Sequence, residues 1–143
     1  MFSIGQLSKQ SDVKVPTIRY YEEMGLLEAP HRTEGNQRRY DSAGLERLRF
    51  IKHARDLGFS IEAIASLIEL QTHPDRSCEA ANSIAVAQLA DVRARIRRLR
   101  ALEQELIRIA DGCDGLGTSA DCYVLASLAD HALCDHDHDR RHD

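Results

Sequence analysis

Residues 78–110 read "CEAANSIAVAQLADVRARIRRLRALEQELIRIA" and contain neither proline nor glycine, and this stretch decides the fold. Its apolar side chains recur in steps of three or four residues, at Leu89, Val92, Ile96, Leu99, Leu102, Leu106 and Ile109. This spacing places them on one face and predicts a single long amphipathic helix. We expect Ser77 or Asp75 to be its N-cap and Gly112 to end it.

Two short helices and a hairpin are predicted upstream of the long helix. Residues 3–27 read "SIGQLSKQSDVKVPTIRYYEEMGLL" and favour two helices, with Pro16 in the first turn of the second and Gly25 at its end. Residues 28–44 read "EAPHRTEGNQRRYDSAG" and are typical of a short β-hairpin, or wing, that turns at Gly35-Asn36.

Two more helices connect this hairpin to the long helix. Asp41 caps the first, which ends at Gly58, and Ser60 caps the second. We expect one side of the first helix to carry Leu45, Leu48, Ile51 and Leu57, and the apolar positions of the second to be Ile61, Ile64 and Ile68. Beyond Gly112, residues 123–130, "YVLASLAD", predict a short final helix.

The composition favours a mainly α fold. The chain has 143 residues, no tryptophan and 5% aromatic residues, a size that suits one ordinary domain or a small domain with an extension. The net charge is −4, but residues 1–57 hold ten Lys and Arg against eight Asp and Glu, which is compatible with DNA contact. The sequence shows no run of about 18 apolar residues and no signal-peptide core. We therefore expect a cytoplasmic protein whose four cysteines are thiols or metal ligands.

Three stretches carry a resemblance to a known family. They are "TIRYYEEMGLL" (17–27), "GNQRRY" (35–40) and "LRFIKHARDLGFSIEAIASLIEL" (48–70). Through them the chain resembles the MerR family of bacterial transcription regulators, and the similarity continues to about residue 130. The resemblance implies a winged helix-turn-helix DNA-binding domain over residues 1–71, a linker and long antiparallel dimerisation helix over 72–111, a metal-binding loop and short helix over 112–130, and a His/Asp-rich flexible tail over 131–143.

The same resemblance implies DNA contacts from two segments. Thr17, Arg19, Tyr20 and Tyr21 would lie on or beside the recognition helix, and Arg38, Arg39 and Tyr40 on the wing. Arginine and threonine reach base edges or phosphates, and arginine and tyrosine commonly anchor the DNA backbone. Alternatives stay open, because either recognition-helix tyrosine could pack the domain and either wing arginine could be a solvated charge. Lys52 and Arg55, on a separate helix, could serve DNA or solvent.

The cysteines predict a site shared between two copies of the chain. At about 1.5 Å per residue, the long helix separates Cys78 from Cys113 by roughly 50 Å, so these two thiols cannot meet within one chain. A helix this long and amphipathic needs a partner, and an antiparallel copy would bring Cys113 and Cys122 beside the partner subunit's Cys78. The first turn of a helix also favours the thiolate form of Cys78. The alternative for each cysteine is a small buried hydrophobic residue.

The pattern of Cys78, Cys113 and Cys122 is similar to that of the family's sensors of divalent ions, and this resemblance implies that three thiolates bind zinc, cadmium, lead or mercury. Three thiolates suit Hg²⁺, Pb²⁺ and Cd²⁺, whereas Zn²⁺ requires a fourth ligand. By resemblance, the family's copper(I) sensors have serine where this chain has Cys78, and its zinc sensors carry extra Cys and His in the loop. Here the loop has no His and Asp114 follows Cys113. Asp114, Asp121, water or a tail residue would have to complete a zinc site, so the expected ligand is Cd²⁺, Pb²⁺, Zn²⁺ or Hg²⁺.

The tail, "HALCDHDHDRRHD", concentrates four of the seven histidines in its thirteen residues. Cys134, His131, His136 and His138 form a candidate secondary metal site without a stiff scaffold, or an extension that closes over the first site. The other interpretation is a solubilising tail that binds no metal.

Together these features predict a cytoplasmic homodimer that binds double-stranded promoter DNA and responds to a divalent metal ion. As the family implies, it represses without metal and activates a metal-resistance or efflux promoter by distorting the DNA, so that RNA polymerase can engage it. An enzyme is disfavoured, because no Ser/His/Asp or Cys/His arrangement stands near the loop. The rival interpretations are the same fold sensing Cu(I), oxidants or electrophiles, and a cytosolic metal buffer.

Overall fold

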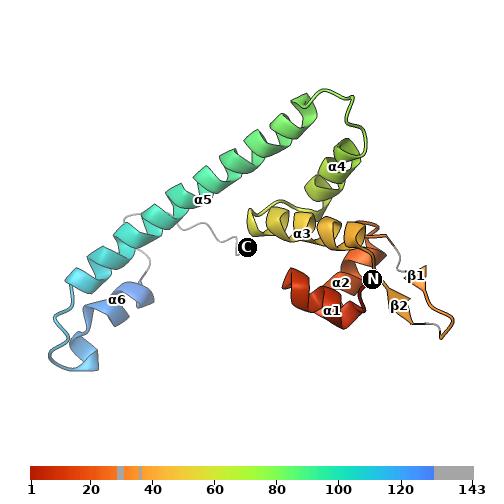
Figure 1. The fold of residues 1–143 in the computed structure, drawn as a ribbon. Helices are drawn as coiled ribbons and strands as arrows, with labels where there is room; N and C mark the ends of the chain where they lie inside the picture. The colour runs from red at the N-terminus through yellow and green to blue at the C-terminus, as the bar shows by residue number, and fades with distance from the viewer. Residues whose placement is uncertain (29–30, 36, 131–143) are drawn as a thin grey trace. The chain divides into compact units, whose positions relative to one another are not determined.

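The computed structural model describes residues 1–28, 31–35 and 37–130, and Figure 1 shows a mainly helical chain. Its elements are α1 (Ile4–Ser11), α2 (Val15–Glu23), β1 (His31–Arg32), β2 (Arg38–Arg39), α3 (Ser42–Asp56), α4 (Ile61–Gln71), α5 (Glu79–Asp111), the 3-10 turn η1 (Ser119–Asp121) and α6 (Tyr123–Ala129). The chain forms two compact units, residues 1–88 and residues 89–143, so α5 contributes to both.

Helices α1 and α2 form the helix-turn-helix, and local signals set their ends. The Ser3 hydroxyl accepts from the Gln6 amide, while the Gln6 side chain accepts from the Ser3 amide, which makes a capping box for α1. As predicted, Pro16 lies in the first turn of α2. Gly25, at φ +77°, adopts the left-handed conformation that ends this segment. The side chains of Leu7 and Ile18 are fully buried between the helices and the rest of the unit.

The wing is an antiparallel pair of two-residue strands. His31 pairs with Arg39 and Arg32 with Arg38, and the Thr33 amide donates to the Gln37 carbonyl at 3.0 Å. The described residues on both sides of the turn confirm the predicted hairpin, while Asn36 itself lies outside them. Two backbone hydrogen bonds of 2.7 and 2.8 Å between Phe2 and Tyr40 connect the wing to the N-terminal segment.

Helices α3 and α4 complete the first unit and begin at the predicted caps. The Asp41 carboxylate accepts from the Gly44 amide at 2.8 Å, and the Ser60 hydroxyl accepts from the Ala63 amide at 3.1 Å. The buried core contains Leu7, Val13, Ile18, Tyr21, Leu26, Leu27, Tyr40, Leu45, Leu48, Ile51, Ala54, Ile64 and Ile68.

Leu57 was predicted on the same side of its helix as Leu45, Leu48 and Ile51, but its side chain is 56% exposed. Helix α3 ends at Asp56, and Leu57 is its C-cap, still in a helical conformation. Nine residues separate Leu57 from the buried Leu48, which is about 2.5 helical turns, so the helix directs the Leu57 side chain to the opposite face. The Leu57 carbonyl instead accepts a 3.0 Å hydrogen bond from the Gln88 side chain in the first half of α5.

The long helix α5 is continuous from Glu79 to Asp111, which confirms the main prediction from residues 78–110. Its N-cap differs from the prediction, since the Cys78 carbonyl accepts the first helical bond, from the Asn82 amide at 2.9 Å. Ser77, one residue earlier, still accepts from the Glu79 amide at 3.1 Å. Cys78 therefore occupies the N-cap position itself.

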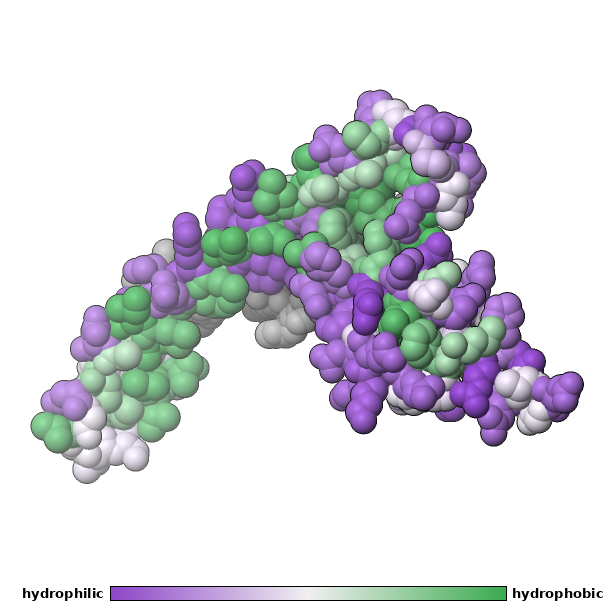
Figure 2. Space-filling model, viewed as in Figure 1, coloured by the Kyte–Doolittle hydropathy of each residue, from purple (hydrophilic) through white to green (hydrophobic). Residues whose placement is uncertain are grey.

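Most of the apolar stripe on α5 is exposed in the single chain. Figure 2 shows apolar side chains along this helix. The exposed large apolar side chains on α5 are Val86, Leu89, Val92, Ile96, Leu99, Leu106 and Ile107. Only the end of the stripe is covered, where Ile109 is buried. Among the described residues, no helix is both long and apolar enough to span a membrane.

Candidate DNA interface and metal-binding loop

Helix α2 presents only some of the residues predicted to contact DNA. Arg19 and Tyr20 are exposed, and Thr17 is half-buried on the same helix. Tyr21 is buried in the core of the unit, with its ring centroid 6.0 Å from that of Tyr20. Tyr21 therefore packs the domain, which is one of the alternatives that the sequence left open.

The residues predicted to contact DNA from the wing also differ in their exposure. Arg39 is half-buried and donates to the Gln37 side chain at 3.2 Å. Tyr40 is buried and its hydroxyl donates to the carboxylate of Glu22 on α2. This bond joins the wing to the recognition helix, so the Tyr40 side chain fixes their relative placement. Arg38 contributes its backbone to β2.

The two basic residues left open by the sequence both have partners inside the domain. Lys52 pairs with Asp56 at 3.1 Å, one turn along α3. Arg55 donates to the Phe59 carbonyl at 2.8 Å and so helps to close the turn between α3 and α4. These contacts favour a structural role for both side chains.

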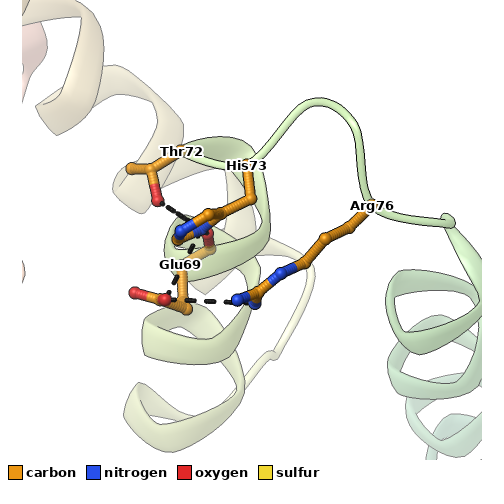
Figure 3. A network of polar contacts seen from close by, with 4 residues as sticks. All are labelled: Glu69, Thr72, His73 and Arg76. Carbon is orange, nitrogen blue, oxygen red and sulfur yellow. Dashed lines mark hydrogen bonds and ion pairs between the residues drawn. The ribbon is translucent and has the colours of Figure 1, made fainter.

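A polar network organises the turn between α4 and α5 (Figure 3). His73 Nδ1 lies 2.9 Å from the Glu69 carbonyl and 3.1 Å from Thr72 Oγ1. The Glu69 carboxylate lies 3.5 Å from His73 Nδ1 and 4.0 Å from Arg76 Nη1. The network precedes Cys78, whose side chain is exposed. A pattern of polar residues three and four apart in "ELQTHPDR" was the only available signal for it.

The loop after α5 brings two of the predicted ligands together. Cys113 and Cys122, called the loop thiols below, are half-buried, with their Sγ atoms 3.9 Å apart. Gly115 and Gly117, at φ +76° and +91°, supply the left-handed turns that reverse the chain between them. The loop thiols form a preformed pair of soft donors.

The acidic residues of the loop are engaged by the loop itself. The Asp114 carboxylate accepts from the Leu116 amide at 2.8 Å, and the Thr118 hydroxyl donates to Asp121 at 3.4 Å. Such short-range bonds shape the turn. Each carboxylate therefore helps to shape the loop through one of its oxygen atoms.

The surroundings of Cys122 favour its thiolate. The Leu125 amide is the main cause that lowers the pKa of the Cys122 thiol, with smaller contributions from the Val124 amide and the Cys113 side chain, while partial burial opposes them. A thiolate is the form that binds a soft metal ion, so the chemistry of the pair fits such an ion.

The described part of one chain does not hold a complete ligand set. Among residues 1–28, 31–35 and 37–130, no group of three or more His, Cys, Asp and Glu side chains gathers as a metal site. The candidate tail ligands Cys134, His131, His136 and His138 lie outside the described residues. A four-coordinate ion such as Zn²⁺ would therefore need further donors beyond the loop thiols.

Two family models match the chain. The model of the MerR helix-turn-helix family of regulatory proteins matches residues 2–71, and the model described as MerR, DNA binding matches residues 45–109. Together they span α1 through nearly all of α5, which is the part of the fold that carries the helix-turn-helix, the wing and the long helix.

Full-length relatives match almost from end to end. The HTH-type transcriptional regulator ZntR of Escherichia coli K12 is 40% identical over 130 residues, which cover 90% of this chain and 92% of ZntR. The mercuric resistance operon regulatory protein of Pseudomonas fluorescens is 39% identical and covers 88% of this chain and 86% of its own. The structure of PbrR691 from Ralstonia metallidurans CH34 in complex with lead(II) superposes with a TM-score of 0.76 at 41% identity, over 90% of this chain and 99% of that one.

Proposed function

The chain belongs to the MerR family of helix-turn-helix regulatory proteins and is a transcription regulator rather than an enzyme, and on that premise we propose that it switches a promoter in response to a divalent soft metal ion. The proposed ions are Cd²⁺, Pb²⁺, Zn²⁺ and Hg²⁺. Relatives named for mercuric resistance and crystallised with lead(II) support this choice of ligand class. Acting on promoter DNA, such a regulator would work in the cytoplasm.

The pairing of the loop thiols is the observation that carries the proposal. Their Sγ atoms are 3.9 Å apart, and backbone amides at the start of α6 lower the pKa of Cys122. Two adjacent sulfur donors, one of them biased toward the thiolate, favour a soft ion over Mg²⁺ or Ca²⁺, which prefer oxygen. A third donor would complete the site.

We assign the third donor to a second copy of the chain. The exposed apolar stripe of α5 requires a cover, and an antiparallel α5 would provide a matching stripe. In that homodimer the loop thiols of each subunit would meet the partner subunit's Cys78. An exposed Cys78 at the N-cap of α5 is available for such a contact. Dimerisation and metal binding would then be one event.

DNA binding is assigned to α2 and the wing. Thr17, Arg19 and Tyr20 would enter the major groove, while Arg38 and Arg39 would contact phosphates beside it. The two heads of a dimer suit a pseudo-palindromic operator. Without metal the dimer would hold the promoter in a repressed shape, and the metal-bound dimer would distort it so that RNA polymerase engages. The ion can shift this balance only by its difference in affinity for the two conformations.

A metal titration of the reduced protein, next to a Cys78→Ser variant, tests the site. We expect about one ion per subunit, with a thiolate-to-metal absorbance band for Cd²⁺, Pb²⁺ or Hg²⁺, and weaker binding in the variant. Unchanged binding in Cys78→Ser would remove Cys78 and leave a two-thiol site that suits Cu(I). If none of the divalent ions binds, the proposed metal response is overturned.

A second experiment separates regulation from the rival functions. Gel shifts on the chain's own promoter, followed by transcription with RNA polymerase with and without metal, should show specific binding in both states and activation only with the ion. Specific DNA binding that responds only to oxidants would favour redox sensing, which the 3.9 Å thiol pair also suits chemically. Metal binding without a specific gel shift would indicate a metal buffer.

A further inference from the structure

The two ends of the metal-binding loop are held together by a contact that lies outside the thiols. Gly112 directly precedes Cys113, and Tyr123 directly follows Cys122. The Tyr123 ring packs on Gly112 so closely that a Cβ atom added there would lie 2.2 Å from Cδ1 and 2.4 Å from Cε1. Figure 1 shows α6, which begins with Tyr123, folded back beside the last turns of α5.

Space, rather than backbone conformation, requires the glycine at this position. Gly115 and Gly117 have positive φ values, whereas Gly112 does not. An alanine at Gly112 would suit the backbone but would collide with the ring of Tyr123. The Tyr123 ring is bonded directly to Cβ, so it cannot move aside as the end of a long flexible side chain would.

Two charged residues of α5 hold the Tyr123 ring against Gly112. Arg108 donates to the Tyr123 hydroxyl, and its guanidinium carbon lies 5.9 Å from the ring centroid. The same guanidinium donates to the carboxylate of Glu105, whose side chain is only 3% exposed. A buried carboxylate needs its cation, so Arg108 is fixed by Glu105 and in turn fixes Tyr123.

We propose that this group, called the loop clamp (Glu105, Arg108, Gly112 and Tyr123), positions the loop thiols for the metal ion. The inference rests on the proposed function, since it concerns the same site. The clamp sets the separation of the residues on either side of the loop, and each thiol is one residue inside a clamped end. Tyr123 is a positioning residue in this role, acting through the backbone and making no bond to the ion. Residues that orient metal ligands typically change affinity by about 10–100-fold when removed.

Cadmium affinity measured on the full chain, by competition with a chromophoric chelator, tests the clamp. We expect Gly112→Ala and Tyr123→Ala each to weaken Cd²⁺ binding by about 10–100-fold. Tyr123→Phe retains the ring on Gly112 and loses only the bond to Arg108, so it should rescue most of the affinity. The double variant should lose little more Cd²⁺ affinity than Tyr123→Ala alone, because the ring that an alanine at Gly112 would strike is absent. Leu116→Ala, at an exposed loop position, is the matched control.

A metal-free measurement makes the clamp independent of the proposed function. With Cys78 and Cys134 replaced by serine, the loop thiols equilibrate with oxidised glutathione, forming one protein disulfide and releasing two reduced glutathione molecules. Thiols held close together favour the disulfide, so Tyr123→Ala should lower its fraction at a fixed glutathione ratio while Leu116→Ala leaves it unchanged.

The outcomes separate the two proposals. A wild-type chain that binds no Cd²⁺ would overturn the metal response, and the glutathione equilibrium would then decide the clamp alone. Folded Gly112→Ala and Tyr123→Ala variants, with helical content equal to that of the wild type by circular dichroism, that match it in both measurements would overturn the clamp. An additive double variant would show that Gly112 and Tyr123 act separately and would also overturn it.

Discussion

The DNA-binding unit and the second half of the chain bury their apolar side chains in opposite ways. In residues 1–88, called the head below, Leu48 and Ile51 of α3 are fully buried in a core that joins α1, α2, α3 and α4. Along α5, Leu99 is 61% exposed, and the buried positions near its end include the charged Glu105. A charged side chain at a buried position is unusual, because burial of a charge is costly without a partner.

This difference shows which parts of the chain can act alone. We expect the buried core of the head to hold its recognition surface in place without a partner. The apolar stripe of α5 is exposed in the single chain, so we expect association with a second copy to cover it. Stability there should rise with protein concentration and with any ligand that binds the associated form.

Breaking the α5 stripe should have the largest effect. Leu99→Asp puts a charge on a surface that we expect to be covered in the dimer, where each of two buried leucines contributes about 1.5–3 kcal/mol. Dimer formation should therefore weaken by at least about 3 kcal/mol. Light scattering after size-exclusion chromatography, across a range of concentrations, measures it. Leu57→Asp, at a similarly exposed leucine of the head, is the control, and equal dissociation in both variants would contradict a specific α5 interface.

Truncation of a buried side chain in the head should lower the stability of the head and its DNA binding, rather than metal binding by the loop. Leu48→Ala removes a fully buried side chain and should destabilise the head by about 2–5 kcal/mol. Urea unfolding followed by circular dichroism gives the loss. DNA binding should fall with the folded fraction, whereas Cd²⁺ affinity of the loop should change little. Loss of both activities in parallel would show that the two halves do not fold independently.

Recognition by α2 should depend on its exposed arginine. Arg19→Ala should weaken operator binding by about 1–3 kcal/mol without altering metal stoichiometry. Arg93→Ala changes the net charge equally, at an exposed position on α5, and should leave operator affinity nearly unchanged. Fluorescence anisotropy with labelled operator at fixed salt compares them, and equal losses would indicate a general charge effect.

The sequence predicted those features that depend on neighbouring residues. Pro16 in the first turn of α2 and the caps Asp41 and Ser60 follow from local hydrogen bonding, and the structure has them. The continuous α5 follows from a period that needs no knowledge of tertiary contacts. The family and its mainly α fold could therefore be recognised from the order of the residues alone.

Features that depend on distant residues could not be predicted in this way. Tyr40 looked like a wing residue for DNA, but its hydroxyl reaches Glu22, eighteen positions earlier in the chain. The seat of Tyr123 on Gly112 depends on how α6 folds back, which no local pattern encodes. The error at Leu57 arose from the spacing itself, since nine residues from Leu48 are about 2.5 helical turns and end on the opposite face.

The cap of α4 offers a smaller test of how far the head depends on local signals. Ser60→Ala removes the hydroxyl that accepts from the Ala63 amide and should cost about 1 kcal/mol of stability. Ser66→Ala, on the exposed side of the same helix, removes only a bond to the Glu62 carbonyl and should cost nothing, because alanine favours the helix interior. Thermal melts compare the two variants. Equal losses would mean that burial, and not capping, sets the start of α4.

The smallest expected effect is the pH dependence of the α3 cap. The Gly44 amide is the main cause that lowers the pKa of the Asp41 carboxyl below 3.8, with His31 contributing less. A lowered folded-state pKa means that the carboxylate adds stability above pH 3.8, which is lost as the pH falls through the lower folded value. Asp41→Asn retains an acceptor for Gly44 without the charge. The melting-temperature difference between wild type and variant should therefore be present near neutral pH and shrink toward about pH 3. A difference that persists after the Asp41 carboxyl has become protonated in the folded state would assign the effect to cap geometry.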